Sequence, residues 1–391
     1  MSFVTGEFND SFPPIMDGVA NVVKNYAYWL NKKYGSSYVI TPAFPSYQDS
    51  EEFTVLRYYS VPLPTRYPYR YGIAGLDYKF LQQVRKIPFD IVHAHSPFSA
   101  GSIALDIAHR RNIPIVATFH SKFYDDFKLA LKFDFLARLA MKKVIRFFYT
   151  VDYVWTVNEA TKETLQNYGY KGPVKVVYNG TDFTFPGNPD KELAMVNERL
   201  QLFPDELVFL FVGQHIWQKN VYMMIESLHL LKKKGAKFKM IFVGTGYAAG
   251  QMKTLVKKLE LQKYAYFMGV ILDRDFLRAL FIRADLFLFP SICDNAPIVV
   301  REAAACRCPS LLIEKTNAAE GVIDNYNVFL APNDANLYAD RLFKLIKDRE
   351  KTRQVGLAAQ KTISKNWEEL VDDIHKYYSE IIDLYQVKNK V

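Results

Sequence analysis

The chain has 391 residues, more than a single hydrophobic core usually serves, so two domains of ordinary size are expected. Hydrophobic residues make up 50% and charged residues 23%, and no uncharged apolar run approaches the ~18 residues that a membrane-spanning helix needs. The net charge of +9 favours anionic partners, but it does not choose between nucleic acid, phospholipid and phosphorylated substrates.

The N-terminus and the cysteines indicate the compartment. The chain has no basic start followed by an apolar block, so no secretory signal is visible and a cytoplasmic location is expected. Cys293, Cys306 and Cys308 are too few and too close together for a disulfide framework, and no second ligand cluster completes a zinc site. We expect them to be reduced thiols.

Residues 1–187 alternate short apolar runs with helical patterns, which predicts an α/β domain. Its opening loop, residues 8–19, is rich in turn formers, and Gly18 stands where a helix is expected to begin over residues 19–30. A glycine there would let a ligand approach backbone N–H groups, although a simple turn requirement is the commoner reason for such a residue. Residues 37–41 are a predicted strand, and 42–72 an irregular loop with short strands.

Two predicted strands of this domain end on histidine. Residues 89–95 end on His95, and residues 113–120 end on His120 after an intervening helix at 100–111. Because the carboxyl ends of strands line the ligand crevice of open α/β sheets, we expect His95 and His120 to reach a substrate. We interpret His93 as a structural residue whose side chain alternates away from His95.

Residues 122–146 carry seven basic side chains against three acidic ones. At about 100° per residue they predict one basic amphipathic helix, with the opposite face apolar from Phe133 to Phe148. Such a helix suits an anionic membrane surface, but a solvated basic face over a buried apolar one fits equally well. Nucleic acid is not expected, because no zinc-finger or other basic motif of known groove geometry is present. The basic face comprises Lys128, Lys132, Arg138, Lys142, Lys143 and Arg146.

Residues 188–365 read as a second, independent α/β unit that begins with a polar helix at 188–203. A strand at 207–212 runs into Gly213, Gln214 and Lys219 before a helix at 220–234, and a glycine and a lysine in a strand-to-helix loop suit a diphosphate. The next glycine turn, after Lys239, lacks the third glycine of a dinucleotide fingerprint. Further strands are predicted at 264–269, 286–289, 311–313 and 328–330, with a helix at 277–283. Residues 336–384 are nearly all helical in pattern, and residues 366–391 are expected to pack back on the first domain.

The stretch after the strand at 286–289 sets Asp294 and Glu302 around the start of a predicted helix at 298–305. The free N–H groups of a helix N-terminus, with Asn295 or Ala296 near the cap, suit an anionic or hydroxyl-rich ligand. An ordinary strand-to-helix turn explains the spacing as well.

The order of these loops resembles family 4 of the glycosyltransferases, retaining sugar transferases with the GT-B fold, over nearly the whole chain. The similar features are the Pro-Pro-x-x-x-Gly-Val loop, the Val-His-Ala-His and Thr-Phe-His strand ends, Asn179-Gly180, Val212-Gly213 followed by Lys219, and Pro290-Ser291 leading to an acidic residue, seven residues and Glu302-Ala303. The last is the most specific. The resemblance implies an α/β fold of two Rossmann-like domains facing across a cleft, with an acceptor domain at 1–187 and a donor domain at 188–365.

The resemblance also implies a role for each matching residue. Glu302 would hold the ribose hydroxyls of a nucleotide sugar, such as UDP-glucose, and Asp294 would meet hydroxyls of the transferred sugar. Lys219 would bind the diphosphate, beside Gly213 and Gln214. Gly18 would face the phosphates from the first domain, and His120 would contact the sugar near the reacting centre. Backbone amides of Asn295, Ala296, Pro297 and Ile298 would surround sugar and phosphate.

Transfer from a nucleotide sugar creates a cationic, oxocarbenium-like centre beside a departing diphosphate, so lysine and helix N-termini would stabilise the leaving group. The family's proposed front-face attack, in which the leaving phosphate helps to take the acceptor's proton, is implied by the resemblance alone. No aspartate pair with metal-ligand spacing is visible, so neither a metal nor another cofactor is expected beside the nucleotide sugar.

Three residues depart from the family pattern. Gln214 stands where arginine is usual, Asp294 where glutamate is usual, and Arg307 where glycine is common. The shorter Asp294 still accepts two hydrogen bonds, which indicates a change in sugar choice or position. Gln214 removes a phosphate-binding charge, and an inactive relative that serves as a partner or scaffold therefore remains an alternative.

The stretches 95–98 and 119–122, together with the basic helix, are similar to bacterial family members that glucosylate diacylglycerol. A lipid acceptor at the inner face of a membrane is therefore the first expectation, with His95 and the basic residues Lys128, Lys132, Arg138 and Lys142 on the acceptor or membrane side. Transfer to a soluble or polymer acceptor in capsule or cell-wall assembly is the alternative. A sugar-nucleotide epimerase on the same fold would need acids near the second carbon of the sugar, and none is identified.

Overall fold

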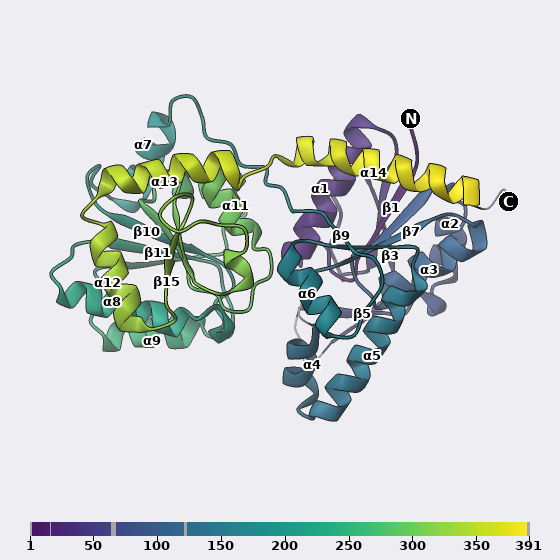
Figure 1. Ribbon diagram of the computed structural model, residues 1–391, viewed down its shortest axis with the longest axis horizontal. Helices are drawn as coiled ribbons and strands as arrows, with labels where there is room; N and C mark the ends of the chain where they lie inside the picture. Colours follow the sequence, from purple (N-terminus) through teal and green to yellow (C-terminus); the bar gives the residue numbers. More distant parts are fainter. Residues whose placement is uncertain (1, 16, 64–67, 121–122, 389–391) are drawn as a thin grey trace. The chain divides into compact units, whose positions relative to one another are not determined.

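Figure 1 shows a computed structural model of the chain, which describes residues 2–15, 17–63, 68–120 and 123–388. The chain forms two compact units. Unit 1 comprises residues 1–179 and 367–391, and unit 2 comprises residues 180–366. The division falls after Asn179, whereas the sequence placed the boundary after residue 187.

Unit 1 is built on a seven-stranded parallel sheet with the order β3-β2-β1-β6-β7-β8-β9. Its first strand was not predicted, because Gly6 and Glu7 interrupt the apolar pattern of so short a segment. The strands are β1 (Thr5–Phe8), β2 (Ser37–Pro42), β3 (Thr54–Tyr58), β6 (Ile91–Ala94), β7 (Ile115–Phe119), β8 (Tyr153–Thr156) and β9 (Lys175–Val176), and β4 (Ser60–Pro62) and β5 (Arg70–Gly72) form a separate antiparallel pair.

The two faces of this sheet differ in chemistry. On one face, Phe8, Ala94 and Phe119 pack with the helices α3 and α5 in an apolar core. On the other face, Glu7 and His93 meet aromatic side chains of α1 and α14. The helices of unit 1 are α1 (Gly18–Lys33), α2 (Tyr78–Val84), α3 (Ser99–Arg111), α4 (Phe123–Leu131), α5 (Asp134–Thr150), α6 (Glu159–Asn167) and α14 (Trp367–Lys388).

The predicted single basic helix is wrong. The segment forms two helices, α4 and α5, because Lys132 adopts a positive φ of 60° and Phe133 is the N-cap of α5. Figure 1 shows the pair projecting from the rest of unit 1. Phe133, expected on the apolar face, is 62% exposed, whereas Ala137, Val144 and Phe148 are buried as predicted.

Unit 2 contains a six-stranded parallel sheet with the order β12-β11-β10-β13-β14-β15. The strands are β10 (Val208–Val212), β11 (Lys239–Val243), β12 (Ala265–Gly269), β13 (Leu286–Phe289), β14 (Ser310–Ile313) and β15 (Phe329–Ala331). The helices are α7 (Asp190–Leu200), α8 (Val221–Lys233), α9 (Ala249–Lys258), α10 (Arg274–Arg283), α11 (Ile298–Ala305), α12 (Ala335–Leu345) and α13 (Arg349–Thr362). The strand bounds lie within two residues of the predicted ones, and α11 begins and ends at the predicted residues. The helix α9 was not predicted, and α10 begins three residues before its predicted start.

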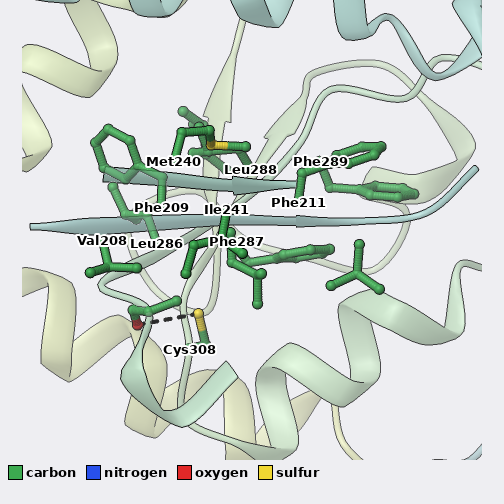
Figure 2. Packing of buried hydrophobic residues seen from close by; sticks show 14 of the residues in the cluster. Val208, Phe209, Phe211, Met240, Ile241, Leu286, Phe287, Leu288, Phe289 and Cys308 are labelled. Atoms are coloured by element: carbon green, nitrogen blue, oxygen red, sulfur yellow. Dashed lines mark hydrogen bonds between the residues drawn. The ribbon is translucent and has the colours of Figure 1, made fainter. Parts of the chain in front are cut away.

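The central strands of unit 2 are almost wholly apolar, because a parallel sheet covered on both faces has no solvent side. Figure 2 shows Phe209, Phe211 and Phe287 packed in this core, where all three are inaccessible to solvent. Cys308 lies at the edge of the same cluster and donates from Sγ to the carbonyl of Ala284 at 3.5 Å. It is a free thiol, like Cys293 and Cys306, as the sequence predicted.

Each sheet changes direction beside its first strand. The chain builds outward from β1 through β2 to β3, then returns to add β6 on the other side, and unit 2 does the same with β10 and β13. Ligands of doubly wound sheets bind at such switch points, outside the carboxyl ends of the strands. The two switch points therefore indicate where the functional residues of each unit should be sought.

None of the helices in the described part of the chain combines the length and the apolar character that crossing a membrane requires.

Candidate active site

The loop after β10 lies against the loop after β11 at the switch point of unit 2. Gly213 donates its N–H to the carbonyl of Val243 at 3.1 Å. Gly244 has a φ of +124°, and a Cβ there would lie 2.0 Å from the carbonyl oxygen of Gly213. Only glycine satisfies both conditions. The predicted glycine turns therefore hold the two loops back to back.

The structure brings together two predicted site residues, Lys219 and Asp294, which are 75 positions apart. Lys219 Nζ lies 2.5 Å from Asp294 Oδ1 and 2.6 Å from Oδ2, with the two side chains 13% and 21% exposed. Lys219 ends the short helix η3 (Trp217–Lys219), and the next residue, Asn220, donates to the carbonyl of Pro290 at 3.3 Å. Loops from neighbouring strands thus meet in a preformed ion pair.

The remaining predicted residues of this loop surround the start of α11. Pro297 is the N-cap, one or two positions later than expected, and Ile298 is the first helical residue. Among the described residues, no side-chain hydrogen bond caps this N-terminus. Asn295 accepts a hydrogen bond from Asn317 Nδ2 at 3.0 Å, and Gln214 is exposed.

Glu302 lies on α11 with only 3% of its surface exposed. Burial raises the pKa of its carboxyl, and the guanidinium of Arg274 opposes that shift. Arg274 Nη2 lies 2.7 Å from Glu302 Oε1. A carboxylate this deeply buried is stable in its ionised form only when a charged partner offsets the cost of its desolvation.

Arg274 contacts both Glu302 and Asp182, and the sequence singled out neither Arg274 nor Asp182. Arg274 Nη2 also donates to Asp182 Oδ1 at 2.5 Å, and its guanidinium lies 4.2 Å from the ring centre of Phe183. Arg274 is the first residue of α10, directly after the N-cap Asp273, and nothing in the helical pattern separates it from an ordinary surface arginine. Only the fold shows that it faces Glu302.

The structure explains how an arginine is tolerated at position 307, where glycine is common in the family. It follows the C-cap of α11 with a φ of 58°, a left-handed conformation that glycine adopts at little cost. Its side chain compensates by donating from Nε to Gln360 Oε1 at 2.8 Å and lying 4.0 Å from the ring centre of Phe185. These contacts offset the cost of the left-handed backbone at the end of α11, and none of them involves the Lys219–Asp294 pair.

In unit 1, the structure brings the two predicted histidines together. His95 Nδ1 lies 3.1 Å from His120 Nε2, at the ends of the neighbouring strands β6 and β7. Burial lowers the pKa of His95 to about 3, and it lowers the pKa of His120 well below the usual value. Both rings are therefore neutral at physiological pH.

The expectation that His93 points away from His95 is wrong. Residues two apart in a strand share a face, and the two rings stack with their centres 4.0 Å apart. The structural role assigned to His93 is nevertheless consistent with its contacts, because Nδ1 lies 2.5 Å from Tyr378 Oη and Nε2 lies 2.7 Å from Thr118 Oγ1.

Glu7, which the sequence did not single out, completes this cluster. Its Oε2 lies 2.8 Å from His95 Nε2, and its ligand atoms lie within 4.8 Å of those of His93 and His95. Such a group could hold a metal ion, but every ring nitrogen of His93 and His95 already has a protein partner. The sequence feature that could have pointed to Glu7 is an acidic residue inside a short strand.

Gly18 begins α1, with Asp17 as the N-cap accepting from the N–H of Ala20 at 2.8 Å. A Cβ at Gly18 would meet no described atom within 4 Å, so the described surroundings do not require a glycine there. Lys128, Lys132, Arg138 and Lys142 are exposed on α4, α5 and the turn between them, and Lys122 lies outside the described residues.

Two families together match most of the chain. Residues 16–185 match Glycosyltransferase Family 4, and residues 196–362 match Glycosyl transferases group 1. The chain is 24% identical to the alpha-monoglucosyldiacylglycerol synthase of Streptococcus pneumoniae, over 86% of this chain and 74% of that protein. It is 26% identical to the putative teichuronic acid biosynthesis glycosyltransferase TuaC of Bacillus subtilis, over 76% of this chain and 72% of that protein.

Solved structures share the fold. The Anabaena protein HepE, crystallised in complex with UDP and glucose, superimposes with a TM-score of 0.76 at 18% identity, over 97% of this chain and 100% of that one. Two parallel-sheet units, the family matches and this likeness agree with the GT-B fold that the sequence implied. The chain is therefore a GT-B glycosyltransferase, with an N-terminal part of Glycosyltransferase Family 4 and a C-terminal part of Glycosyl transferases group 1.

Proposed function

We propose that this glycosyltransferase moves a hexose from a nucleotide sugar, UDP-glucose or a close analogue, to a hydroxyl of a lipid acceptor at a membrane surface, with retention of configuration. The observation that carries the donor assignment is the pair of charged contacts at the switch point of unit 2, Lys219 with Asp294 and Arg274 with Glu302. The likeness to a protein crystallised with UDP and glucose supports the choice of nucleotide.

Each group at this point has a chemical task. Lys219 balances the charge that the diphosphate gains as the glycosidic bond breaks, and the N–H groups from Asn295 to Ile298 add to that stabilisation. Asp294 accepts hydrogen bonds from hydroxyls of the sugar while it holds Lys219 in place. Because Gln214 supplies no charge, Lys219 bears most of the phosphate contact in this loop. We assign Gly18 to the phosphates and His120 to the sugar.

Glu302 is assigned to the ribose. A carboxylate accepts two hydroxyl hydrogen bonds in a planar geometry, which suits a vicinal diol. Arg274 fixes the orientation of that carboxylate by binding Oε1 and favours its ionised form against the effect of burial. We therefore assign Arg274 as the residue that positions Glu302.

The lipid acceptor is supported by the paired helices α4 and α5. Leu131, Phe133, Phe135 and Leu139 are between 38% and 67% exposed around the turn between these helices. Exposed lysines and arginines lie on the same pair, and apolar side chains beside basic ones are the composition of an interfacial membrane contact. One relative is named as a synthase of a glucosyldiacylglycerol, which supports the same assignment.

The donor assignment is tested by nucleotide binding. Calorimetry with UDP, GDP and ADP and with their glucose conjugates identifies the base, and the best nucleotide is then compared with its 2′-deoxy and 3′-deoxy forms. Glu302→Ala should weaken the ribonucleotide at least tenfold, as expected for ~1.5–3 kcal/mol from a hydrogen bond to a charged group. It should also abolish the preference over the deoxy forms. Arg274→Met should give an intermediate loss.

The matched control is Glu260→Ala, which removes the same charge from an exposed residue between the end of α9 and the amino end of β12, whereas the switch-point loops follow the carboxyl ends of the strands. Its affinity should equal that of the wild type. Unchanged discrimination between ribose and deoxyribose in Glu302→Ala contradicts the ribose assignment, and failure of every nucleotide to bind contradicts the donor assignment.

A polymer acceptor is the second candidate, favoured by the relative named for teichuronic acid biosynthesis. The two differ in their need for a membrane. Transfer to diacylglycerol in anionic vesicles, with none to soluble glycans, supports the lipid acceptor. Transfer to a cell-wall glycan without vesicles supports the alternative.

A further inference from the structure

Three buried side chains of unit 1 form a continuous hydrogen-bonded row that ends on His120. Glu7 Oε2 lies 2.8 Å from His95 Nε2, and His95 Nδ1 lies 3.1 Å from His120 Nε2. Glu7 is 0% exposed, and the two histidines are 2% and 8% exposed. The row joins the middle of the sheet to the carboxyl end of β7.

The two contacts of His95 are coupled, because a neutral imidazole carries one N–H and one bare nitrogen. When Glu7 is a carboxylate, it accepts the N–H of His95 Nε2. His95 Nδ1 then accepts the N–H of His120 Nε2, and His120 Nδ1 is left as an acceptor. When Glu7 is protonated, each bond reverses, and His120 Nδ1 carries the proton and is a donor.

We propose that Glu7 is a positioning residue for His120: through His95, it sets whether His120 meets its other partners with an N–H donor or with a bare ring nitrogen. Nδ1 is the relevant atom because the row engages Nε2. The further step, that one of those partners is the transferred sugar, rests on the function proposed above.

The energetics of burial select one of the two forms. Desolvation raises the pKa of Glu7 to about 8, against the opposing effect of the hydrogen bond from Tyr378. Desolvation also lowers the pKa values of His95 and His120, so neither becomes an imidazolium near neutral pH. At pH 7 Glu7 is therefore mostly protonated, and His120 presents an N–H.

When His120 releases its Nδ1 proton, each hydrogen bond of the row still has one donor and one acceptor. The proton leaves His120 Nδ1 for an outside acceptor, the proton of His95 Nδ1 moves to His120 Nε2, and the proton of Glu7 moves to His95 Nε2. One negative charge remains, on Glu7. His120 can thus release a proton without first becoming a cation, which its burial disfavours.

The surroundings of Glu7 allow both forms. Tyr378 Oη donates to Glu7 Oε1 at 3.3 Å and accepts from His93 Nδ1 at 2.5 Å, and neither bond uses Oε2. Desolvation and the charge of Glu7 raise the pKa of Tyr26, so this residue stays neutral. The titratable groups facing Glu7 from the described elements packed on it are His93 and His95 of β6, His120 after β7, Tyr26 of α1 and Tyr378 of α14.

The test reads the tautomer directly. Long-range proton–nitrogen NMR of the full chain with nitrogen-15 histidine, without donor, should show the proton of His120 moving from Nδ1 to Nε2 with a midpoint near pH 8. Glu7→Gln should hold the Nδ1–H form at every pH, because the glutamine amide N–H donates to His95 Nε2 as the protonated acid does. The His120 signal is assigned from its absence in His120→Gln.

Thr118→Val is the matched control. It removes the hydrogen bond that Thr118 Oγ1 donates to His93 Nε2 on the same buried face and leaves the row intact, so the transition of this variant should match that of the wild type. If His120 of the wild type keeps a single tautomer from about pH 6 to about pH 10, that result alone overturns the proposal. An unchanged transition in Glu7→Gln would also overturn it.

Activity then separates this inference from the proposed function. Wild-type kcat should fall by about tenfold per pH unit above the midpoint, and Glu7→Gln should lack that alkaline limb while its KM for the donor stays within about threefold of the wild type. A tautomer transition with no effect on donor turnover supports the row and refutes the role of His120 at the sugar. The same transition in the presence of a chelator excludes a bound metal as its cause.

Discussion

At the scale of single residues, burial and the neighbouring charge together decide the chemistry of both clusters. Glu302 and Glu7 are both deeply buried acids, and desolvation raises the pKa of each. They differ in their partners, because Glu302 is held by the cation Arg274, whereas Glu7 is held by neutral His95 and Tyr378. Glu302 is therefore suited to accept hydrogen bonds as an anion, and Glu7 to store a proton.

The buried cluster around Glu7 should give unit 1 a stability maximum near neutral pH. The folded state binds the proton of Glu7 more tightly than the unfolded state, whose carboxyl has a pKa of 4.5, so stability falls as pH rises towards about 8. The histidines have lowered pKa values and bind protons less tightly when folded, so their contribution is lost as pH falls below 6.5.

Urea unfolding of the wild type and Glu7→Gln at several pH values isolates the carboxyl contribution, because both proteins keep the histidines. Between about pH 5.5 and about pH 8, the wild type should lose at least ~1 kcal/mol of unfolding free energy relative to the variant, since one pKa unit corresponds to ~1.4 kcal/mol. Tryptophan fluorescence suits the measurement, because three of the four tryptophans, Trp29, Trp155 and Trp367, lie in unit 1. Parallel pH curves for the two proteins would show that the pKa of Glu7 is not raised.

At the scale of elements, one residue divides the basic segment and changes its surface. Lys132 leaves the helical conformation, so α5 starts anew at Asp134 and turns Phe133 and Phe135 outward. A continuous helix would have put Phe133 on the apolar face with Ala137. The break therefore adds exposed aromatic rings to a basic surface, and this combination is the basis on which we propose an interfacial membrane contact.

Binding to vesicles tests this surface. Lys128→Glu, Lys132→Glu and Lys142→Glu together should weaken sedimentation with anionic vesicles at least tenfold, since each basic residue near such a surface contributes ~1 kcal/mol. Phe133→Ser with Phe135→Ser should weaken it also at high salt, where the electrostatic attraction is screened. The control reverses three exposed lysines of unit 2, Lys257, Lys258 and Lys263. An equal loss of sedimentation in the control would show that binding depends on net charge alone.

At the scale of the whole molecule, the chain returns to the unit in which it began. The last helix, α14, belongs to unit 1, where Trp367 and Ile374 are inaccessible to solvent and Tyr378 reaches the cluster around Glu7. Figure 1 shows this helix lying along unit 1, beside α1. The fold of unit 1 thus depends on residues that follow all of unit 2 in the sequence.

Ile374→Asn should therefore destabilise unit 1 and leave unit 2 unchanged. Placing a polar amide in a filled core costs about 3 kcal/mol or more. Thermal unfolding followed by tryptophan fluorescence should shift to lower temperature, whereas nucleotide binding by unit 2 should persist to the wild-type temperature. Lys376→Asn, an exposed neighbour on the same helix, should change neither. A parallel loss of nucleotide binding in Ile374→Asn would show that the units do not unfold independently.

The sequence determined most of this architecture, because hydrophobic periodicity is a local property. The strands of unit 2 were predicted closely, since they are continuous apolar runs between turn residues, but the helix α9 was not predicted. The same local pattern led to the prediction of His95, His120, Lys219 and Asp294 as site residues, each of which follows a strand. It missed β1, whose glycine and glutamate break the apolar pattern.

Tertiary structure alone decided which of these residues touch. The order of the strands brings Lys219 to Asp294, Arg274 to Glu302, and Glu7 to His95, and each pair is separated by at least 28 residues. Local pattern carries no information on such pairings. The same holds for burial, which raises the pKa of both glutamates and leaves the neighbouring group, Arg274 for Glu302 and His95 for Glu7, to set the role of each. Local sequence therefore determines the helices and strands, but the charged side chains find their partners only when the two sheets have formed.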